Sequence, residues 1–190
     1  MPEHRLKPQL SLAGATPRTD RFAGLTITEN GSLALASLAC RRGRDADFAA
    51  AAQSLFGFAM PGPGRFTSRP PFTAYWTGPG QWFVEAPFET HEEIARILKE
   101  KMQGTASVTE QTDGWARFDI EGARLADVFE RLCGLDVRAM QAGDVSRTII
   151  EHLGVLVACG IAGQRLSLLG PRSAARSLHH ALVTAAKSAL

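Results

Sequence analysis

One short stretch, residues 112–135 (TDGWARFDIEGARLADVFERLCGL), most constrains what this chain can fold into. Residues 116–121 alternate apolar and charged side chains, which is the period of a half-buried strand. From Leu125 to Leu132 the apolar residues recur every three or four positions, which predicts a helix that buries one face. Gly134 is typical of the left-handed residue that ends a helix. The sequence therefore predicts a strand joined to a helix with almost no connection.

Elsewhere the chain contains paired strands, each group followed by one helix. Asn30-Gly31 between two apolar runs is a strong hairpin signal, and Pro79-Gly80 suits the centre of a type II turn. Three further short strands are expected within residues 145–169. The predicted order is ββα, ββα, ββα, βββα. This order indicates an α+β protein made of two ferredoxin-like subdomains with antiparallel sheets, and it does not fit a doubly wound parallel sheet.

Length and composition fit one folded domain with an N-terminal arm. The chain has 190 residues, of which 45% are hydrophobic and 21% charged, as in a globular protein. Residues 1–20 are polar and rich in proline and glycine, so we expect an arm whose order depends on docking. Residues 21–190 are expected to form a single α+β domain. Its subdomains are placed at about 21–104 and 105–190, with interleaving of the two left open.

Composition excludes several classes of protein. The net charge is only +2 and no block of basic residues occurs, so we expect no nucleic-acid partner. The three cysteines are far apart and odd in number, which argues against a disulfide framework and a zinc site. We find no secretory signal and no run of about 18 apolar residues. These features predict a cytoplasmic protein without a membrane partner.

No catalytic constellation or metal site can be recognised from residue spacing, so no catalytic residue and no metal ligand is assigned. The best single acid–base candidate is His152, because Glu151 and Arg147 lie close to it in sequence. On a strand, however, Glu151 and His152 would point to opposite faces. We therefore interpret His152 as a structural or interface histidine.

The strand at 116–121 also carries a polar face, formed by Arg117, Asp119 and Glu121. The two carboxylates could form an acid–base pair, but Arg117 on the same face would neutralise them. We interpret this face as exposed to solvent or to a partner protein.

A short predicted hairpin carries four large aromatic rings, Tyr75, Trp76, Trp82 and Phe83. Four rings exceed what one sheet face needs, and aromatic residues are enriched at interface cores. Core packing and a partner surface explain them equally well. Together with the proline-rich segment 60–71, these rings indicate that the chain is a subunit of a larger complex.

Four segments, MPGPGRF at 60–66, YWTGPGQWFVEAP at 75–87, TDGWARFDIEGARLADVFERLCGLDV at 112–137 and SRTIIEHLGVLV at 146–157, occur in a specific order and spacing. In this order they resemble the gamma subunit of heterotetrameric sarcosine oxidase, over most of the chain from about residue 24 onward. The resemblance implies a fold related to the folate-binding domain of aminomethyltransferases, which also has two ferredoxin-like subdomains.

The resemblance also implies a role in sarcosine catabolism and one-carbon metabolism. The complex would oxidatively demethylate sarcosine to glycine and transfer the one-carbon unit to tetrahydrofolate. This chain would be a structural subunit of that oxidoreductase without an active site, and its partners would be the alpha, beta and delta subunits. Flavin, NAD, tetrahydrofolate and zinc are then expected on the partners and not on this chain. The expected partner interface consists of Tyr75, Trp76, Trp82, Phe83 and His152.

Two alternatives stay open. The chain could be a free-standing module that binds folate or another one-carbon carrier between its halves. Arg117, Asp119 and Arg147 would then meet a pterin or a glutamate tail, with Trp115 stacking, and in a structural subunit the same four residues would mark a vestigial folate pocket. The isolated chain could also form homo-oligomers through the aromatic hairpin. For the polar face of 116–121 we favour a partner protein over solvent or a folate pocket.

Overall fold

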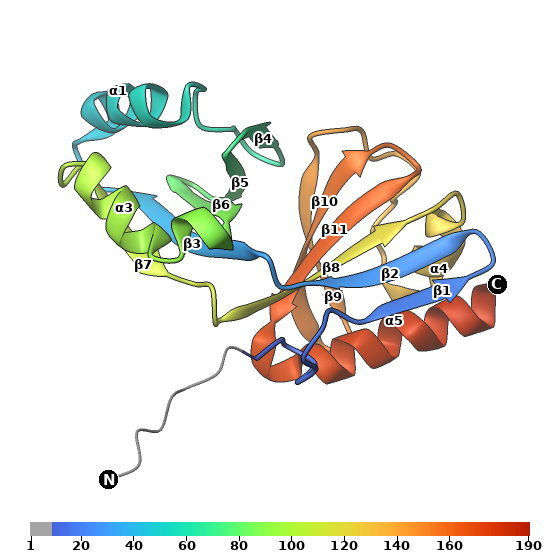
Figure 1. Cartoon of the computed structure of the whole chain (residues 1–190). Coiled ribbons are helices and arrows are strands. Elements are labelled where there is room, and N and C mark those ends of the chain that lie inside the picture. The colour runs from blue at the N-terminus through green and yellow to red at the C-terminus, as the bar shows by residue number, and fades with distance from the viewer. Residues whose placement is uncertain (1–8) are drawn as a thin grey trace, which may run out of the picture.

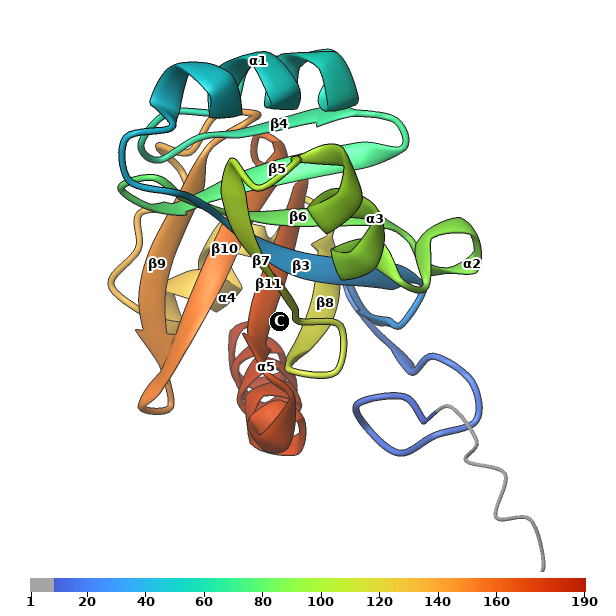
Figure 2. The same ribbon diagram turned by 90° about the vertical axis from the view of Figure 1, so that its left-hand side faces the viewer.

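The structure is a computed structural model, and it describes residues 9–190. Two antiparallel sheets pack against each other, and helices cover the outer face of each sheet (Figure 1). The chain therefore forms helix, sheet, sheet and helix layers, which Figure 2 shows from a second direction. The predicted α+β class with antiparallel sheets is confirmed.

Sheet A has six strands in the order β1-β2-β8-β11-β10-β9. They are β1 (Thr19–Phe22), β2 (Leu25–Asn30), β8 (Trp115–Glu121), β9 (Val145–Ile150), β10 (Leu153–Ile161) and β11 (Arg165–Pro171). Its outer face is covered by α4 (Leu125–Leu132) and α5 (Ala175–Ala189), and η1 (Arg172–Ala174) leads into α5. The strand–helix joint predicted from the sequence is β8 followed by α4, with only residues 122–124 between them.

Sheet B has five strands in the order β4-β5-β6-β3-β7. They are β3 (Leu33–Cys40), β4 (Phe66–Arg69), β5 (Phe72–Gly78), β6 (Gln81–Pro87) and β7 (Ala106–Glu110). Its outer face carries α1 (Asp45–Phe56), α2 (Phe88–His91) and α3 (Ile94–Lys101). The hairpin predicted at Pro79-Gly80 joins β5 to β6, and Gly80 has the positive φ of 66° that a type II turn requires.

Apolar side chains fill the spaces between these layers. One core lies between sheet A and its helices, and it contains the predicted α4 stripe with Leu125, Val128 and Phe129 buried. A second core lies between sheet B and α1 and α3. A third and smaller core lies between the two sheets, where side chains from both sheets meet. The sheets are therefore joined by a thin apolar layer, which leaves room for polar side chains.

The hairpin predicted at Asn30-Gly31 is wrong. Strand β2 pairs with β1 and β8 in sheet A, whereas β3 pairs with β6 and β7 in sheet B. The Asn30 side chain donates a hydrogen bond to Asp119 Oδ2 at 2.7 Å, and the Leu10 side chain packs against the Cα of Gly31. The chain therefore crosses between sheets at this point. Sheet A uses residues 19–30 and 115–171, and sheet B uses residues 33–110, so the two halves interleave.

The described part of the N-terminal arm docks on this chain's own sheet A. The carboxylate of Glu29, which is only 2% exposed, accepts hydrogen bonds from Ser11 Oγ at 2.6 Å and from Leu12 N at 2.8 Å. The backbone N–H of Arg18 donates to the same carboxylate at 3.3 Å. Strand β1 begins at Thr19, within the range assigned to the arm. The remainder of the predicted arm, residues 1–8, lies outside the described residues.

Two predicted element ends differ from the structure. Helix α4 ends at an extended Cys133 with φ −160°, and Gly134 does not adopt the predicted left-handed conformation. Helices α2 and α3 are separate and short, and neither has a side-chain cap.

The strand predicted through His152 ends instead at Ile150. Glu151 and His152 form a two-residue turn between β9 and β10, with φ values of 49° and 65°. Such a turn normally contains asparagine and glycine, so the sequence gives no local signal for it.

Substitution of Gly122, which lies between β8 and α4, tests how closely this joint packs against the turn between β1 and β2. The φ of Gly122 is 139°, and a Cβ added there would overlap the backbone of Gly24. We expect Gly122→Ala to lower the free energy of unfolding by about 3 kcal/mol, as measured by urea denaturation. Gly134→Ala is the matched control, because a Cβ there meets nothing within 4 Å. It should change the free energy by less than about 0.5 kcal/mol, and equal effects of the two substitutions would contradict the prediction.

Candidate functional site

A cluster of polar side chains lies between the two sheets, and we call it the inter-sheet network. It draws on β2, β8 and β11 of sheet A and on β5 and β6 of sheet B. Alternation along β8 turns Phe118 and Ile120 toward the helices, so the residues between them face sheet B. The network consists of Asn30, Tyr75, Glu85, Arg117, Asp119 and Ser167.

Arg117 is at the centre of this network. Its Nη1 donates to both carboxylate oxygens of Glu85 on the opposite sheet, at 2.8 and 2.7 Å. Its Nε donates to Asp119 Oδ1 at 2.8 Å, and its Nη2 donates to Ser167 Oγ at 2.8 Å. Every nitrogen of the guanidinium therefore has an acceptor within the chain.

The two carboxylates also receive further hydrogen bonds. Tyr75 Oη donates to Glu85 Oε1 at 2.6 Å. Asp119 accepts from Ser167 Oγ at 2.7 Å and from Asn30 Nδ2 at 2.7 Å. Among the described residues, no buried side-chain nitrogen or oxygen lacks a partner. A buried polar network stabilises a fold only when its members are satisfied, and this one satisfies itself with its own side chains.

Burial and charge oppose each other in setting the pKa values of the network. Burial lowers the pKa of Arg117, but Glu85, Tyr75 and Asp119 together outweigh this effect and hold that pKa above its usual value. Burial raises the pKa of Asp119, but the charge of Arg117 and the hydrogen bonds to Asp119 bring it below its usual value. Burial, together with the charge of Glu85, raises the pKa of the Tyr75 hydroxyl well above its usual value. At neutral pH Arg117 is therefore charged, Asp119 is ionised and Tyr75 keeps its proton.

The four residues expected to mark a folate pocket do not form one pocket. Arg117 and Asp119 lie together in the network. The Trp115 ring packs edge-on against Phe83, with ring centres 5.0 Å apart. Arg147 is exposed on the edge strand β9, in the same cross-strand row as Arg117 but three strand spacings, about 14 Å, away. Two buried leucines of β10 and β11 lie between these two arginines.

Two of the five expected interface residues lie in the core. Tyr75 is 3% exposed and Phe83 is 7% exposed, and both pack between the sheets. They point inward because they share a face with Glu85 and oppose each other across the β5–β6 pair. Their assignment to a partner surface is corrected: in this chain both side chains are buried against sheet A.

The other three expected interface residues are more accessible. Trp82 stacks on Phe48 of α1, with ring centres 5.2 Å apart, and its Nε1 donates to the Pro61 carbonyl at 2.8 Å. Trp82 therefore packs α1 against sheet B and hydrogen-bonds the proline-rich segment to it. Trp76 pairs with Trp82 across the hairpin and is half-buried. His152 is exposed in the β9–β10 turn.

Three members of the network, Asn30, Glu85 and Ser167, are not predicted from the sequence. Glu85 gives the clearest signal that could have been used, because a charged residue on an inward position of the apolar run WFVEAP needs a buried partner. Ser167 gives a weaker signal, as a polar residue within the run RLSLL. Glu121, which the alternation places on the same face as Arg117, is exposed and takes no part in the network.

Within residues 9–190, no group of three or more His, Cys, Asp or Glu side chains is placed to hold a metal ion. The three cysteines are free. No helix in this part of the chain is long and apolar enough to span a membrane.

This chain is similar to known structures in its fold. No family model and no curated protein sequence matches it. A chain of heterotetrameric sarcosine oxidase from Corynebacterium sp. U-96, in complex with pyrrole 2-carboxylate, is similar with a TM-score of 0.74 and 20% identity, covering 86% of this chain and 84% of that chain. The aminomethyltransferase T of the glycine cleavage system from Bartonella henselae is similar with a TM-score of 0.61 and 12% identity, covering 85% of this chain and 46% of that chain. The aminomethyltransferase-like fold implied by the four sequence segments is confirmed.

Glu85→Gln tests the ion pair between the sheets. The substitution leaves the buried Arg117 charge without the carboxylate that faces it. Removing one partner of a buried pair costs about 3–5 kcal/mol, so we expect the free energy of unfolding to fall by about 3 kcal/mol in chemical denaturation. Glu121→Gln, a matched change at an exposed position of β8, the strand that carries Arg117, should cost less than about 0.5 kcal/mol. Similar losses in both variants would show that the network does not stabilise the contact.

Asp119 makes stability depend on pH. Its folded-state pKa lies below the unfolded value of about 3.9, so its contribution is present above that value and is lost as pH falls through the folded pKa. We expect the free energy of unfolding to decrease from about pH 5 to about pH 3, and less steeply in Asp119→Asn. Asp20 and Asp127 also have lowered pKa values, so the difference between the two curves is the measurement. Parallel curves would exclude this role for Asp119.

Proposed function

We propose that this chain is the gamma-type, structural subunit of a heterotetrameric complex that oxidatively demethylates sarcosine and passes the one-carbon unit to tetrahydrofolate. The main support is the fold similarity to a chain of heterotetrameric sarcosine oxidase, which covers most of both chains. The chain spans about half the length of the aminomethyltransferase that it matches. The similarity to the aminomethyltransferase therefore covers only part of that enzyme.

The inter-sheet network supports a structural role for this chain. The nitrogens of Arg117 and the carboxylate oxygens of Asp119 are bonded to side chains of the same chain. A ligand between the sheets would have to replace these bonds, and each lost bond to a charged group costs about 1.5–3 kcal/mol. In this proposal flavin, NAD, tetrahydrofolate and zinc are held by the alpha, beta and delta subunits, and this chain supplies packing surface.

Strand β9 offers the best surface for a partner subunit. Its Ile149 side chain is 65% exposed, and β9 is an edge strand whose outer side is open beyond Val145, where the N–H donates to the Gly64 carbonyl. The exposed His152 lies at the end of the same strand. We therefore place this contact at Ile149 and His152, in place of the buried Tyr75 and Phe83, and keep Trp76 and Trp82 on sheet B as candidates for a separate contact.

Co-expression tests the assembly. When this chain is produced with candidate alpha, beta and delta subunits, we expect one flavoprotein that contains all four chains. Size-exclusion chromatography with absorbance of the flavin follows the complex. If this chain elutes alone while the other subunits are folded and associated, the proposal is wrong.

Ile149→Glu tests the proposed surface. A charge at an apolar contact should reduce the amount of this chain in the complex at least tenfold, which corresponds to about 1.4 kcal/mol. The variant should fold normally, because the side chain is exposed. Ile161→Glu is the matched control, since Ile161 is 43% exposed at the far end of β10. Full recovery of the complex with Ile149→Glu would rule out β9 as the contact.

One observation favours a second candidate function, a free-standing module that binds folate. It is the similarity of the fold to an aminomethyltransferase. Titration of the isolated chain with tetrahydrofolate, followed by tryptophan fluorescence, separates the two candidates. A saturable change would support the module, and light scattering on the same sample reports homo-oligomers.

A further inference from the structure

We propose that a groove beside α5 binds a small oxyanion, either a phosphate or a carboxylate group of a ligand. The groove has a volume of about 700 Å³ and lies between α5, the end of α4 and the tip of the β9–β10 hairpin. It belongs to the outer helical layer of sheet A, so it is separate from the inter-sheet network. Its polar lining includes Arg131, Glu151, Arg176, His180, Thr184 and Ser188.

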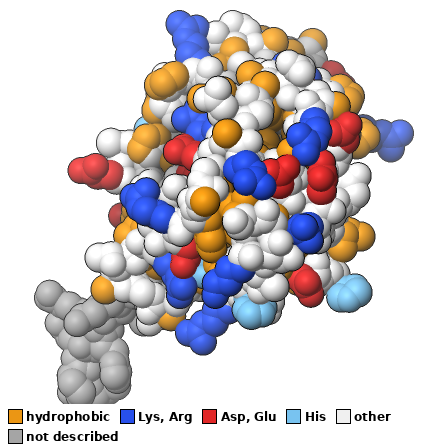
Figure 3. Space-filling view, turned by 90° about the vertical axis from the view of Figure 1, so that its right-hand side faces the viewer, with side chains coloured by type: hydrophobic (Ala, Val, Ile, Leu, Met, Phe, Trp, Pro, Cys, Tyr) orange, Lys and Arg blue, Asp and Glu red, His pale blue; other side chains and the backbone are white. Residues whose placement is uncertain are grey.

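The lining of the groove carries excess positive charge. Arg131 donates one hydrogen bond, from Nη1 to Ser188 Oγ at 3.2 Å, and within the described part of the chain it has no carboxylate partner. Among residues 9–190, Arg176 has no hydrogen bond or ion pair through its side chain. Glu151 is the one acidic residue in the lining. Figure 3 looks onto the end of the molecule where α5 finishes, and Lys, Arg and His side chains gather along the lower part of this face.

The donors of the groove form a row along one face of α5. Arg176, His180 and Thr184 are spaced four residues apart, so their side chains lie one above another on the helix. Arg131 comes from the last turn of α4 and reaches α5 at Ser188. A planar guanidinium presents paired N–H groups that match the oxygens of carboxylate and phosphate, and the hydroxyls add neutral donors. This combination suits an oxyanion better than a cation or an apolar ligand.

The hairpin tip supplies the acidic residue of the lining. Glu151 and His152 both have positive φ, which for residues other than glycine costs about 1–2 kcal/mol each. The turn places Glu151 in the lining of the groove, together with the residues of the α5 row. This carboxylate repels an anion, so its removal should strengthen anion binding while removal of an arginine weakens it. The two substitutions are therefore expected to act with opposite sign.

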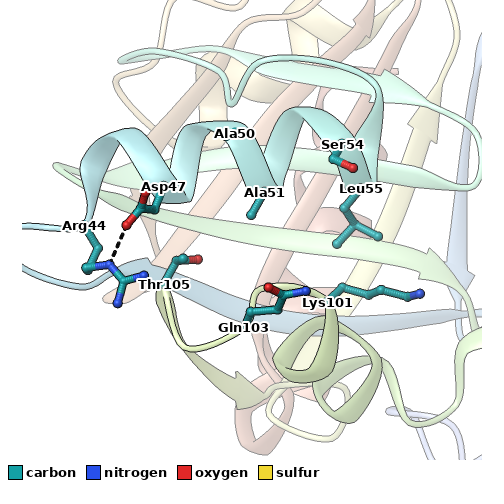
Figure 4. Close-up of a pocket in the computed structure, with 9 residues that line it drawn as sticks. All are labelled: Arg44, Asp47, Ala50, Ala51, Ser54, Leu55, Lys101, Gln103 and Thr105. Carbon is teal, nitrogen blue, oxygen red and sulfur yellow. Dashed lines mark hydrogen bonds and ion pairs between the residues drawn. The ribbon is translucent and has the colours of Figure 1, made fainter.

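A second groove of about 590 Å³ lies under α1 and can be compared with the groove beside α5 as a binding site for oxyanions (Figure 4). Arg44 there is already paired with Asp47, with Nε and Oδ2 2.8 Å apart. Lys101 is the other cation that lines it, and much of the remaining surface consists of short α1 side chains. Because one of its two cations is neutralised, this groove should bind oxyanions more weakly than the groove beside α5.

The test is a titration of the full-length chain with pyrophosphate and, separately, with citrate. Isothermal titration calorimetry at low ionic strength should show saturable binding at one site for at least one of these probes, and the affinity should fall as salt is added. Binding of pyrophosphate alone would assign the site to phosphate ligands, and binding of citrate alone to carboxylate ligands. Because the isolated chain is used, the result does not depend on the complex proposed above.

Three variants locate the binding. Arg176→Gln should weaken the affinity at least tenfold, and Glu151→Gln should strengthen it about threefold because it removes the one negative charge in the lining. Lys101→Gln, in the groove under α1, should leave the affinity unchanged. All three side chains are exposed, so circular dichroism melting curves should match the wild type. No saturable binding of either probe, or equal weakening by Arg176→Gln and Lys101→Gln, would overturn the proposal.

Discussion

The ion pair between Arg117 and Glu85 is the interaction on which the arrangement of the two sheets depends. It joins the central strand β8 of sheet A to β6 of sheet B, and both carboxylate oxygens take part. The apolar core around this pair is small, so the contact between the sheets depends on polar geometry as well as on burial. An apolar contact tolerates sliding, whereas a guanidinium with acceptors on all nitrogens fits in one position only. The network therefore sets how the sheets lie against each other.

The same network explains why the chain can change sheets after β2. Asn30 is the last residue of β2, and its side chain bonds both Asp119 in the network and the backbone of Ser32, which leads into β3. A hairpin turn at this position would direct β3 back along β2, and Asn30 would then lose its bond to Asp119. One residue thus links the crossover of the chain to the contact between the sheets. The docked N-terminal segment adds to this region through Leu10, which packs on Gly31.

Local periodicity accounts for the parts of the fold that the sequence predicts. The strand–helix joint at 112–135, the Pro79-Gly80 hairpin and the three C-terminal strands all have their determining residues close together. Alternation along β8 predicts its polar face but not the residues that this face contacts. Glu85, the partner of Arg117, lies 32 positions earlier in the chain. No local rule connects two such positions. The inward direction of Tyr75 and Phe83 has the same cause, since it is set by the sheet that covers them.

Arg117 differs from Arg131 and Arg176 in its surroundings, and sequence alone cannot show this difference. Arg117 is buried among carboxylates that use its hydrogen-bonding capacity, so its charge contributes to the fold. Arg131 and Arg176 line a groove that contains one carboxylate, and among the described residues neither arginine forms an ion pair. An arginine can bind a ligand only with donors that the fold leaves unused. For this reason we place oxyanion binding in the groove beside α5 and not between the sheets.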